Sequence, residues 1–579
     1  MANTLHDQLT GSDLHDNKVY PATGTPLPSW SPIDSRYDAR YSFKFCQTVG
    51  LSGSNADFIC TGTNDHLVIQ AALNAVHTIG YGWVLLLPGI YYLNGQITVY
   101  PQTLLMGSGM GVTILNATGW ATNGAPVFVN TGSGNADYTF KDFSCIGRFT
   151  PGTGTTYATS GQFGFIVSQA RRVVFDQVYF EGFYDATLIG SKQSAPYNDS
   201  LAALNIKQVV FNNCYCYNCV GGLQGYAQES IIWNANHFEN IGDDACAFLG
   251  AAGNNPRSAK AVMSNNIFKN GVPLNANGVP GVGIFAKVDG AGFGPDNITQ
   301  VEITGNVVEG AYHGLYLANC SRVGLNGNDI SNTTLSAVYM SGGNKVITAT
   351  GNTIVRANMA ADANHASILG VAVDDLTLTG NQIHGDGVAG REGITLQGMY
   401  NRAQVEGNKI NNCFGHSGIY AETVTEGIFT GNIISGPSAR GITVSGSRAI
   451  VALNEFNGAF TSGVLVTPSL TYATIKNNIG LNPELQVDLG SISGAVSIDR
   501  VNGDVFTATQ TSNITLTLVA GKVKGDQLTL KLTTGVFTQA WPSNLKLAGG
   551  ACAMTGTSIL VARWDGVNWV EVSRSLNVS

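Results

Sequence analysis

Short runs of alternating apolar and polar residues return along most of the chain at a nearly constant spacing. In the repeat from Glu302 to Leu317, an apolar run ends in Gly305-Asn306, a second apolar pair follows, a polar loop turns, and a small residue opens another alternating strand. The asparagine marks equivalent places at Asn213, Asn236, Asn266, Asn306, Asn328, Asn352, Asn381, Asn408, Asn432, Asn454 and Asn478. From Asn306 onward the marks are 22, 24, 29, 27, 24, 22 and 24 residues apart. This period predicts an all-β solenoid of stacked parallel coils over residues 111–490.

In such a solenoid the inward Val, Ile, Leu and Phe side chains form one continuous core, and equivalent residues stack about 4.8 Å apart. An asparagine that points inward at a turn can pass hydrogen bonds to the same side chain in the next coil. We therefore expect the repeated asparagines to hold the coils in register and to have no chemistry of their own.

The N-terminal part of the chain has a different pattern. Residues 1–45 carry four prolines among polar residues and predict an extended arm. Residues 46–110 predict an entry segment, in which Asp65 caps a helix that runs through His77 and short strands follow from Trp83.

The C-terminal part differs as well, because the asparagine period stops after Asn478. Residues 491–579 contain strictly alternating runs, and a Trp-Asp-Gly turn beginning at Trp564, followed by Trp569, marks a hairpin. This pattern predicts an antiparallel β-sandwich. Its tryptophans, Trp541 included, are either core residues or a platform that stacks on sugar rings.

Composition narrows the classes of function. Charged residues make up 12% of the chain and glycines number 72, which suits many repeated tight turns. The formal net charge is −8 with no basic run, so the sequence has no signature of nucleic-acid binding. The N-terminus lacks the features of a secretion signal, and no apolar run reaches membrane-spanning length. We therefore expect neither a signal peptide nor membrane insertion.

The ten cysteines show no paired framework. Cys214, Cys216 and Cys219 form an isolated C-x-C-x-x-C with no second cluster of ligands nearby, which favours buried stacking cysteines over a zinc site. No metal or other cofactor is predicted.

Two stretches carry a family resemblance. Thr63-Asn64-Asp65 before a helix, the apolar run 84–91 and the segment 105–109 (Leu-Met-Gly-Ser-Gly) resemble the entry to right-handed parallel β-helix proteins of the pectate-lyase-like superfamily. The Trp-Asp-Gly-x-x-Trp hairpin is similar to the C-terminal modules of phage tail fibres and tailspikes, which hold trimers together or bind sugar. The resemblance implies a right-handed helix with a substrate groove. It leaves the chemistry open, because the superfamily includes lyases, hydrolases, epimerases and tailspikes.

Alignment of the coils on the small residue that opens the strand after the loop defines a column one position before it. The column reads Asp185, Gly221, Asp244, Val282, His313, Ser336, Glu392, Ser417, Arg440 and Ser462. Two coils separate Asp185 from Asp244, which places their backbones about 9–10 Å apart. Side chains can shorten this distance to the roughly 6.5–9.5 Å that separates the acid and the base of inverting glycosidases. Asp243 lies beside Asp244, and repulsion between the two should raise one pKa.

The segment Ile241-Gly242-Asp243-Asp244-Ala245-Cys246 is similar to the Gly-Asp-Asp-Cys catalytic segment of polygalacturonase-type β-helix hydrolases. The resemblance implies that Asp243 or Asp244 is the acid and that Asp185 helps to activate water. The Gly-His-Gly and Arg-Ile-Lys motifs of those enzymes are absent, so recognition of pectin-like uronic acids is not supported. An isolated aspartate at such a turn is better explained as a cap for backbone amides, and it is the Asp-Asp pair in register with a third acid that favours catalysis.

Other polar and aromatic residues on the same coils are candidates for binding substrate. They are Glu181, Glu239, His313, Lys287, Tyr184 and Tyr312. Tyrosines can stack on sugar rings, and the two glutamates form a second acidic pair. The alternatives are a plain loop histidine at position 313 and a solvated ion pair between Lys287 and Asp289.

Together these features look like a phage tailspike. The resemblance implies a homotrimer that is attached to a phage tail or baseplate through the N-terminal arm and cleaves a bacterial surface polysaccharide by endo-hydrolysis. Two other classes stay open. A polysaccharide lyase would use His313, Lys287 and Arg257 to remove a proton and neutralise a carboxylate, and a non-catalytic receptor-binding fibre would use the same fold for adhesion alone.

Overall fold

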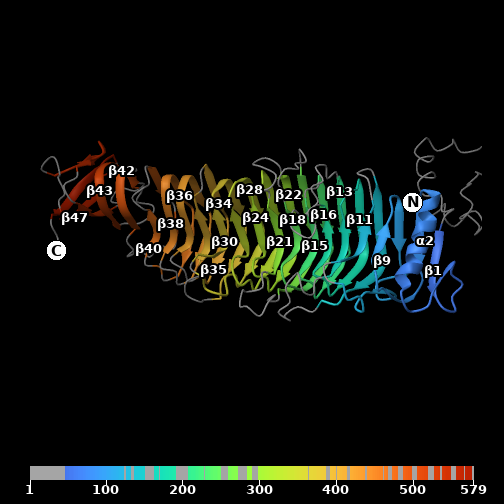
Figure 1. The fold of residues 1–579 in the computed structure, drawn as a ribbon. Helices are drawn as coiled ribbons and strands as arrows, with labels where there is room; N and C mark the ends of the chain where they lie inside the picture. Colours follow the sequence, from blue (N-terminus) through green and yellow to red (C-terminus); the bar gives the residue numbers. More distant parts are fainter. Residues whose placement is uncertain are drawn as a thin grey trace, which may run out of the picture.

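The described part of the chain forms a long rod of stacked strands, with α2 and β1 at one end and β42, β43 and β47 at the other (Figure 1). The computed structural model describes residues 46–576 except for 123–124, 132–135, 150–161, 169, 191–205, 227–228, 250–258, 272–282, 290–297, 363, 387–391, 399–400, 414–416, 437–439, 459, 461, 467–471, 477, 480–486, 499–504, 519–526, 535–537, 549–555 and 566. The predicted arm, residues 1–45, lies outside the described residues.

The rod is a parallel β-helix, in which each coil contributes one strand to each of three faces. A coil runs through face B, then face C, then face A, and each strand pairs in parallel with the equivalent strand of the next coil. For example, β22, β23 and β24 pair with β25, β26 and β27. This arrangement confirms the predicted solenoid of stacked parallel coils.

The strands of the three faces have the following bounds. Face A contains β5 (Ile97–Val99), β8 (Pro126–Asn130), β10 (Phe163–Val167), β12 (Asp185–Ile189), β15 (Gly221–Tyr226), β18 (Asp244–Leu249), β21 (Ile284–Asp289), β24 (Leu315–Ala318), β27 (Val338–Ser341), β30 (Ala366–Val371), β33 (Glu392–Gln397) and β40 (Ser462–Val466). Face B contains β1 (Cys46–Leu51), β3 (Gly82–Leu86), β6 (Thr103–Met106), β13 (Gln208–Asn212), β16 (Ser230–Asn234), β19 (Ala259–Ser264), β22 (Ile298–Thr304), β25 (Arg322–Asn326), β28 (Asn344–Thr350), β31 (Val373–Thr379), β34 (Arg402–Glu406) and β41 (Tyr472–Lys476). Face C contains β4 (Gly89–Tyr92), β7 (Thr113–Asn116), β14 (Tyr215–Tyr217), β17 (His237–Ile241), β20 (Ile267–Gly271), β23 (Val307–Glu309), β26 (Asp329–Ser331), β29 (Thr353–Val355), β32 (Gln382–His384), β35 (Lys409–Asn411), β37 (Ile433–Ser435) and β39 (Glu455–Asn457).

Some strands belong to two faces. β9 (Asp137–Ile146) and β11 (Arg172–Glu181) run from face B into face C, and β36 (Ser417–Thr430) and β38 (Arg440–Ala452) run from face A into face B. The short β2 (Phe58–Cys60) pairs with β1 at the N-terminal end.

The corner between faces B and C repeats one hydrogen-bonding motif in coil after coil. The first corner residue has positive φ, as at Gly305 (65°) and Gly351 (63°), and the next residue is a buried asparagine. Asn328 shows the pattern, because its backbone N–H and its Nδ2 both donate to Oδ1 of Asn352, at 3.0 and 2.9 Å. The Nδ2 also donates to the carbonyl oxygen of Ile303 at 2.9 Å. The asparagines therefore satisfy buried backbone groups at each corner.

The asparagine ladder begins one coil later than the sequence pattern indicates. Asn213 occupies the corner position with positive φ (51°), and the ladder position of that coil belongs to Cys214, whose N–H donates to Oδ1 of Asn236 at 2.9 Å. Asparagine suits both places, because it tolerates a left-handed conformation and also forms local side-chain hydrogen bonds. The sequence alone could not separate the two roles at Asn213.

Helix α2 (Asp65–Ile79) covers the N-terminal end of the rod and packs against β1 and β3. It ends at Gly80, which has positive φ. The prediction that Asp65 is the capping residue was wrong, since Asp65 is the first residue inside the helix. Its buried carboxylate accepts hydrogen bonds from the backbone N–H groups of Gly62 and Tyr92, at 3.0 and 2.8 Å, and so ties the loop before the helix to β4.

A second sheet lies at the C-terminus, as predicted, but its strands do not all run antiparallel. It contains β42 (Val487–Ile498), β43 (Val505–Leu518), β44 (Gln527–Thr534), β45 (Gln539–Ala540), β46 (Leu545–Lys546), β47 (Gly556–Trp564) and β48 (Trp569–Ser575). β42, β43 and β44 pair in parallel, and among the described strands of this sheet only the pairings of β47 with β44 and β48 are antiparallel.

The predicted antiparallel arrangement is therefore corrected for the first strands of this sheet. Val487 pairs with Phe506, and Phe506 pairs with Leu530. Each of these strands therefore still pairs with a strand about one coil further along the chain, although the asparagine marks are absent. Alternation of apolar and polar residues is common to both kinds of sheet, so it could not predict strand direction. Trp564 and Trp569 are buried and their ring centroids are 5.6 Å apart, which makes them core residues.

Among the described residues, no helix is both long enough and apolar enough to cross a membrane.

Replacement of one ladder asparagine should destabilise the rod. In Asn352→Ala, the N–H and Nδ2 of Asn328 lose their acceptor and the carbonyl oxygen of Leu325 loses a donor. Buried groups left without partners cost about 1–3 kcal/mol each, so we expect the free energy of unfolding to fall by about 3 kcal/mol. The midpoint of urea unfolding, followed by circular dichroism, measures this loss. The matched control is the exposed Asn457→Ala, and equal midpoints for the two variants would contradict a structural role for the ladder.

Candidate active site

The column predicted from the sequence lies where the chain turns into face A. Asp185 opens β12 and pairs with Gly221, and Asp244 opens β18 and pairs with Ile284. Ile284, rather than the predicted Val282, is therefore the column residue of its coil. Val282 itself lies outside the described residues, and the variable length of the preceding loop explains the error of two positions.

Asp244 is a buried acid of this column. Its side chain is only 4% exposed, and its Oδ2 lies 3.2 Å from Nζ of Lys287 on β21. Its Oδ1 is buried and accepts no hydrogen bond from the described residues. Burial, followed by the charge of Asp243, raises the pKa of Asp244 to about 7, although Lys287 acts in the opposite direction. Asp244 therefore exchanges its proton near neutral pH, as a general acid must.

Asp185 lies two coils from Asp244 along the same column. It is 2% exposed, and its Oδ1 accepts a hydrogen bond from Nε2 of Gln224 at 3.1 Å. Two parallel coils separate the backbones of the two aspartates by about 10 Å. The charge of Asp185 contributes to the raised pKa of Asp244. The structure thus brings the predicted pair to one place, and Gln224 fixes the orientation of one carboxylate.

The charge of Asp243 acts on the site by raising the pKa of Asp244. It is half-buried at the corner before β18, where its backbone N–H donates to the carbonyl of Val220 at 2.7 Å and its carbonyl accepts from the N–H of Ile284 at 2.9 Å. These two backbone bonds hold the corner in place between the neighbouring coils. Asp244, rather than Asp243, opens the strand and meets Lys287.

Lys287 is part of this carboxylate site. Burial lowers the pKa of Lys287, but the charges of Asp244 and Asp243 outweigh burial, so the net shift is upward and the amine stays protonated. The alternative of a solvated pair with Asp289 is not what the structure shows. Lys287 pairs with Asp244, and Asp289 accepts a hydrogen bond from Nδ2 of Asn319 at 3.0 Å.

His313 lies two coils beyond Asp244 and is buried, with 6% exposure. Its Nδ1 is 3.3 Å from the carbonyl oxygen of Ser336, and burial, followed by the proximity of His365, lowers its pKa to about 4. Its ring is edge-on to Tyr312 at 5.2 Å and stacks on Tyr339 at 5.3 Å. His313 is therefore an uncharged member of an aromatic cluster and not a plain loop histidine.

The remaining predicted binding residues are engaged elsewhere. Glu181 ends β11 and accepts a hydrogen bond from the hydroxyl of Tyr179 at 2.9 Å, and Glu239 on β17 accepts one from Tyr215 at 2.6 Å. Both glutamates belong to face C. Tyr184 precedes Asp185, and its ring is edge-on to Phe163 at 5.9 Å, in a small apolar cluster separate from the main core.

Sequence reasoning missed Gln224, Tyr339 and His365. Gln224, Lys287 and Tyr339 all lie three positions after the column residue of their coils, and strand pairing places them in one outward row. That spacing was visible in the sequence, but only once the column was known. His365 precedes Ala366, the column residue of a coil with a long preceding loop.

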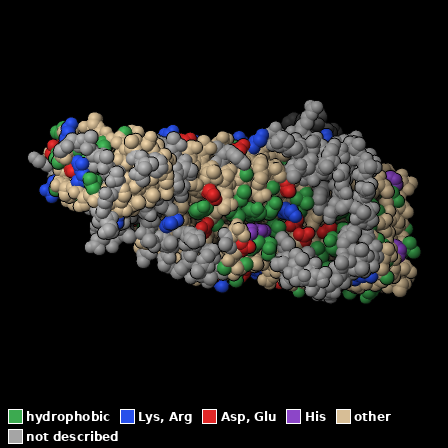
Figure 2. Space-filling model, turned by 60° about the vertical axis from the view of Figure 1, so that its left-hand side comes forward, with side chains coloured by type: hydrophobic (Ala, Val, Ile, Leu, Met, Phe, Trp, Pro, Cys, Tyr) green, Lys and Arg blue, Asp and Glu red, His purple; other side chains and the backbone are tan. Residues whose placement is uncertain are grey.

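The site is therefore a buried carboxylate pair with a lysine, on the outer side of face A, at the N-terminal edge of its strands. Figure 2 shows acidic, basic and histidine side chains gathered with hydrophobic ones in a strip along the middle of one face of the rod. In this arrangement Asp244 can transfer a proton near neutral pH, and the carboxylate of Asp185 can activate a water molecule. Among the described residues, no group of three or more His, Cys, Asp or Glu side chains is placed to hold a metal ion.

Fold and site define a right-handed parallel β-helix with acid–base groups on one outer face. A family model described as "right handed beta helix region" matches residues 283–479. No curated protein matches the sequence.

Solved structures with similar coils include proteins that act on polysaccharides. The A-module of mannuronan C-5 epimerase AlgE6 from Azotobacter vinelandii is 15% identical, with a TM-score of 0.41 over 73% of this chain and 96% of the epimerase module. Tailspike protein 2 of Escherichia coli O157:H7 bacteriophage CAB120 is 14% identical, with a TM-score of 0.36 over 57% of this chain and 37% of the tailspike. The α-1,3-glucanase of Streptomyces thermodiastaticus is 15% identical, with a TM-score of 0.35 over 75% of this chain and 68% of the glucanase unit.

The raised pKa of Asp244 predicts a characteristic dependence of stability on pH. Because the folded-state pKa (about 7) exceeds the ordinary value of 3.8, the folded protein favours the protonated acid. The stability from this preference is present below pH 4 and is lost as the pH rises toward 7. In Asp244→Asn this loss should disappear, so the urea midpoints at pH 5 and pH 8 should differ less than in the wild type. The exposed Asp329→Asn is the control and should keep the wild-type difference.

Proposed function

We propose that this protein is a polysaccharide depolymerase of the tailspike type, which hydrolyses internal glycosidic bonds of a bacterial capsule or O-antigen. The observation that carries the proposal is the pair of buried carboxylates, Asp244 and Asp185, two coils apart on one face of the β-helix. Asp244 has a pKa of about 7. In inverting glycosidases an acid with raised pKa and a carboxylate base lie about 6.5–9.5 Å apart, which two coils and flexible side chains permit.

In this mechanism Asp244 is the general acid. The carboxyl of Asp244 carries the proton and donates it to the glycosidic oxygen. As the proton leaves, negative charge develops on the carboxylate, and Lys287, 3.2 Å from Oδ2, stabilises it. The lysine therefore helps the protonated acid to give up its proton.

Asp185 is the general base. The hydrogen bond from Gln224 holds its Oδ1, and its carboxylate removes a proton from the water molecule that attacks the anomeric carbon. Attack by water on the face opposite the leaving group inverts the anomeric configuration. The similarity of residues 242–246 (Gly-Asp-Asp-Ala-Cys) to the catalytic segment of polygalacturonase-type hydrolases supports an acid at Asp243 or Asp244 and a base at Asp185.

A lyase is the second candidate, because His313 is an uncharged base one coil from Lys287 and two coils from Asp244. Its pKa of about 4 leaves the imidazole neutral at pH 7. In β-elimination, His313 would take the proton beside a uronate carboxylate and Lys287 would neutralise that carboxylate. The third residue of this hypothesis, Arg257, lies outside the described residues. Unsaturated products that absorb in the ultraviolet would identify a lyase and exclude the hydrolase.

Substitution of the two aspartates tests the hydrolase. Asp244→Asn and Asp185→Asn should each lower kcat by about 100- to 10,000-fold on purified bacterial surface polysaccharides, while Asp329→Asn should keep wild-type activity. Wild-type activity should fall as the pH rises above about 7, because Asp244 must be protonated. Size analysis of the released oligosaccharides measures both effects.

Full activity in Asp244→Asn would contradict the assigned acid. If no polysaccharide yields products and Asp244→Asn leaves phage adsorption intact, the protein is a receptor-binding fibre without catalytic activity.

The proposal includes a homotrimer on a phage virion, with the N-terminal arm contacting the tail or baseplate. Support comes from exposed apolar side chains at the C-terminal hairpin, namely Val567 (74% exposed), Val570 (36%), Val572 (58%) and Leu576 (47%). Such a patch is typical of a surface that is covered by another subunit.

Light scattering should give three times the chain mass of 60.7 kDa. Val570→Asp/Val572→Asp should dissociate the trimer, and a wild-type monomer would contradict this part of the proposal.

A further inference from the structure

An aromatic cluster lies on face A next to the carboxylate site, and the acid–base mechanism does not use it. It consists of Tyr312, His313, Tyr316, Tyr339 and His365, from three successive coils. His313 is its centre, because the other four rings lie 5.2–6.4 Å from the His313 ring. Tyr316 and Tyr339 meet edge to face at 5.3 Å. The cluster therefore forms one continuous aromatic surface.

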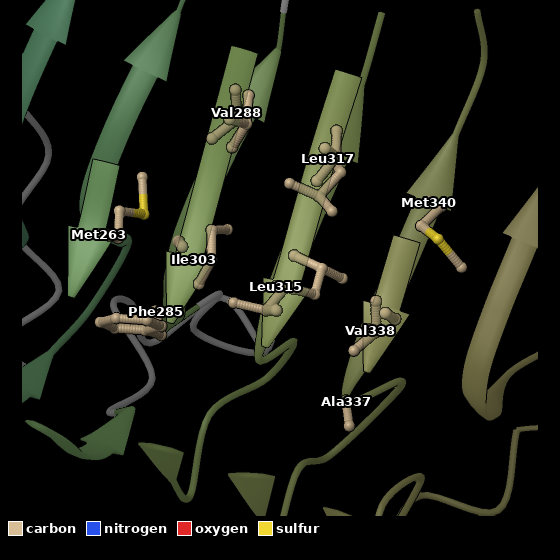
Figure 3. Close-up of a cluster of buried hydrophobic side chains, with 14 of the residues drawn as sticks. Met263, Phe285, Val288, Ile303, Leu315, Leu317, Ala337, Val338 and Met340 are labelled. Carbon is tan, nitrogen blue, oxygen red and sulfur yellow. The ribbon is translucent and has the colours of Figure 1, made fainter. Parts of the chain in front are cut away.

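The two tyrosines on the strands point away from the core. On β24, Leu315 and Leu317 are buried in the interior, and on β27, Val338 and Met340 are buried in the same way (Figure 3). Successive side chains of a strand point to opposite sides, so Tyr316 and Tyr339, which lie between these pairs, face outward. Both are half-buried, whereas His313 behind them is 6% exposed.

Two tyrosines of the cluster also continue, without a gap, the outward row that contains Gln224 and Lys287. Strand pairing places Lys287 beside Tyr316, and Tyr316 beside Tyr339. Each step is about 4.8 Å, so Tyr339 lies about 10 Å from the lysine that contacts Asp244. One oligosaccharide lying along the rod can therefore contact the acid and the aromatic cluster at the same time.

The rings of the cluster offer apolar faces and hydroxyl groups, while charges lie at its edges, with Lys287 beside Tyr316 and Asp362 close enough to act on the pKa of His365. The pKa values of both His313 and His365 are lowered, chiefly by burial, so both imidazoles are neutral. Oγ of Ser336 lies 3.1 Å from Nδ1 of His365, and the hydroxyl of Tyr316 lies 3.4 Å from Oγ of Ser341. Aromatic faces stack on the C–H faces of sugar rings, and neighbouring hydroxyls can bind sugar hydroxyls.

We propose that Tyr316, Tyr339 and His365, supported by the buried His313, form a binding subsite for an uncharged sugar ring of the polysaccharide. The inference rests on the proposed depolymerase function and specifies its substrate. The residue bound about two coils from the cleaved bond is a neutral sugar, since the cluster itself supplies no cation and Lys287, beside Tyr316, is already paired with Asp244.

A binding experiment tests the subsite separately from catalysis. The inactive full-length Asp244→Asn protein is applied to an array of defined bacterial oligosaccharides, some composed only of neutral sugars and some containing uronate or phosphate. We expect binding to glycans with neutral segments. Addition of Tyr339→Ala should weaken this binding by about ten-fold, because it removes one stacking ring, whereas Tyr339→Phe should retain it. The matched control is Tyr420→Ala, since Tyr420 lies in the same outward row three coils further along.

Kinetics separate a binding role from a purely structural one. In the active protein, Tyr339→Ala should raise KM more than it lowers kcat, with the urea midpoint unchanged.

Equal binding with and without Tyr339→Ala, or binding only to acidic glycans, would overturn the inference even where the wild type cleaves polysaccharide. If the wild type releases no products and Asp244→Asn binds no glycan, both the subsite and the proposed function fail.

Discussion

The register between neighbouring coils is the constraint on which the rest of the structure depends. At the corner between faces B and C, a residue with positive φ precedes a buried asparagine, and the asparagine bonds both the backbone and the side chain of its neighbour. A parallel sheet that slips by one residue would turn its core side chains outward. The asparagine ladder prevents such a slip, because each side-chain amide bonds the asparagine of the next coil and a backbone carbonyl oxygen of the preceding coil.

A fixed register turns positions in the sequence into straight rows on the surface. Asp185 and Asp244 belong to one row, and Gln224, Lys287, Tyr316 and Tyr339 belong to the adjacent one. Each coil therefore contributes one or two side chains to a site that extends along the rod, with charged groups at Asp244 and uncharged rings beyond Lys287. Because each coil contacts only its neighbours, one part of this row can change while the others keep their geometry.

The sequence predicted whatever follows from a repeated local pattern. The asparagine period predicted the coils, and counting from it brought Asp185, Asp244 and His313 into one column. The errors have physical causes. A long loop shifted the column from Ile284 to Val282, and the strands β42–β44 continue the parallel pairing without any asparagine mark. Partners such as Gln224 and His365 depend on which side chains meet between coils, and only the folded chain shows this.

The position of Asp244 is costly for folding, and the cost explains its chemistry. A carboxyl that is buried and beside Asp243 is disfavoured in its charged form. Lys287 offsets part of this penalty, but not enough to restore the ordinary pKa. An asparagine of similar shape would remove the penalty, so a protein selected for rigidity alone would gain from the change. The carboxyl and the lysine together instead maintain a proton that is released near neutral pH, next to the row in which Lys287 is followed by Tyr316 and Tyr339.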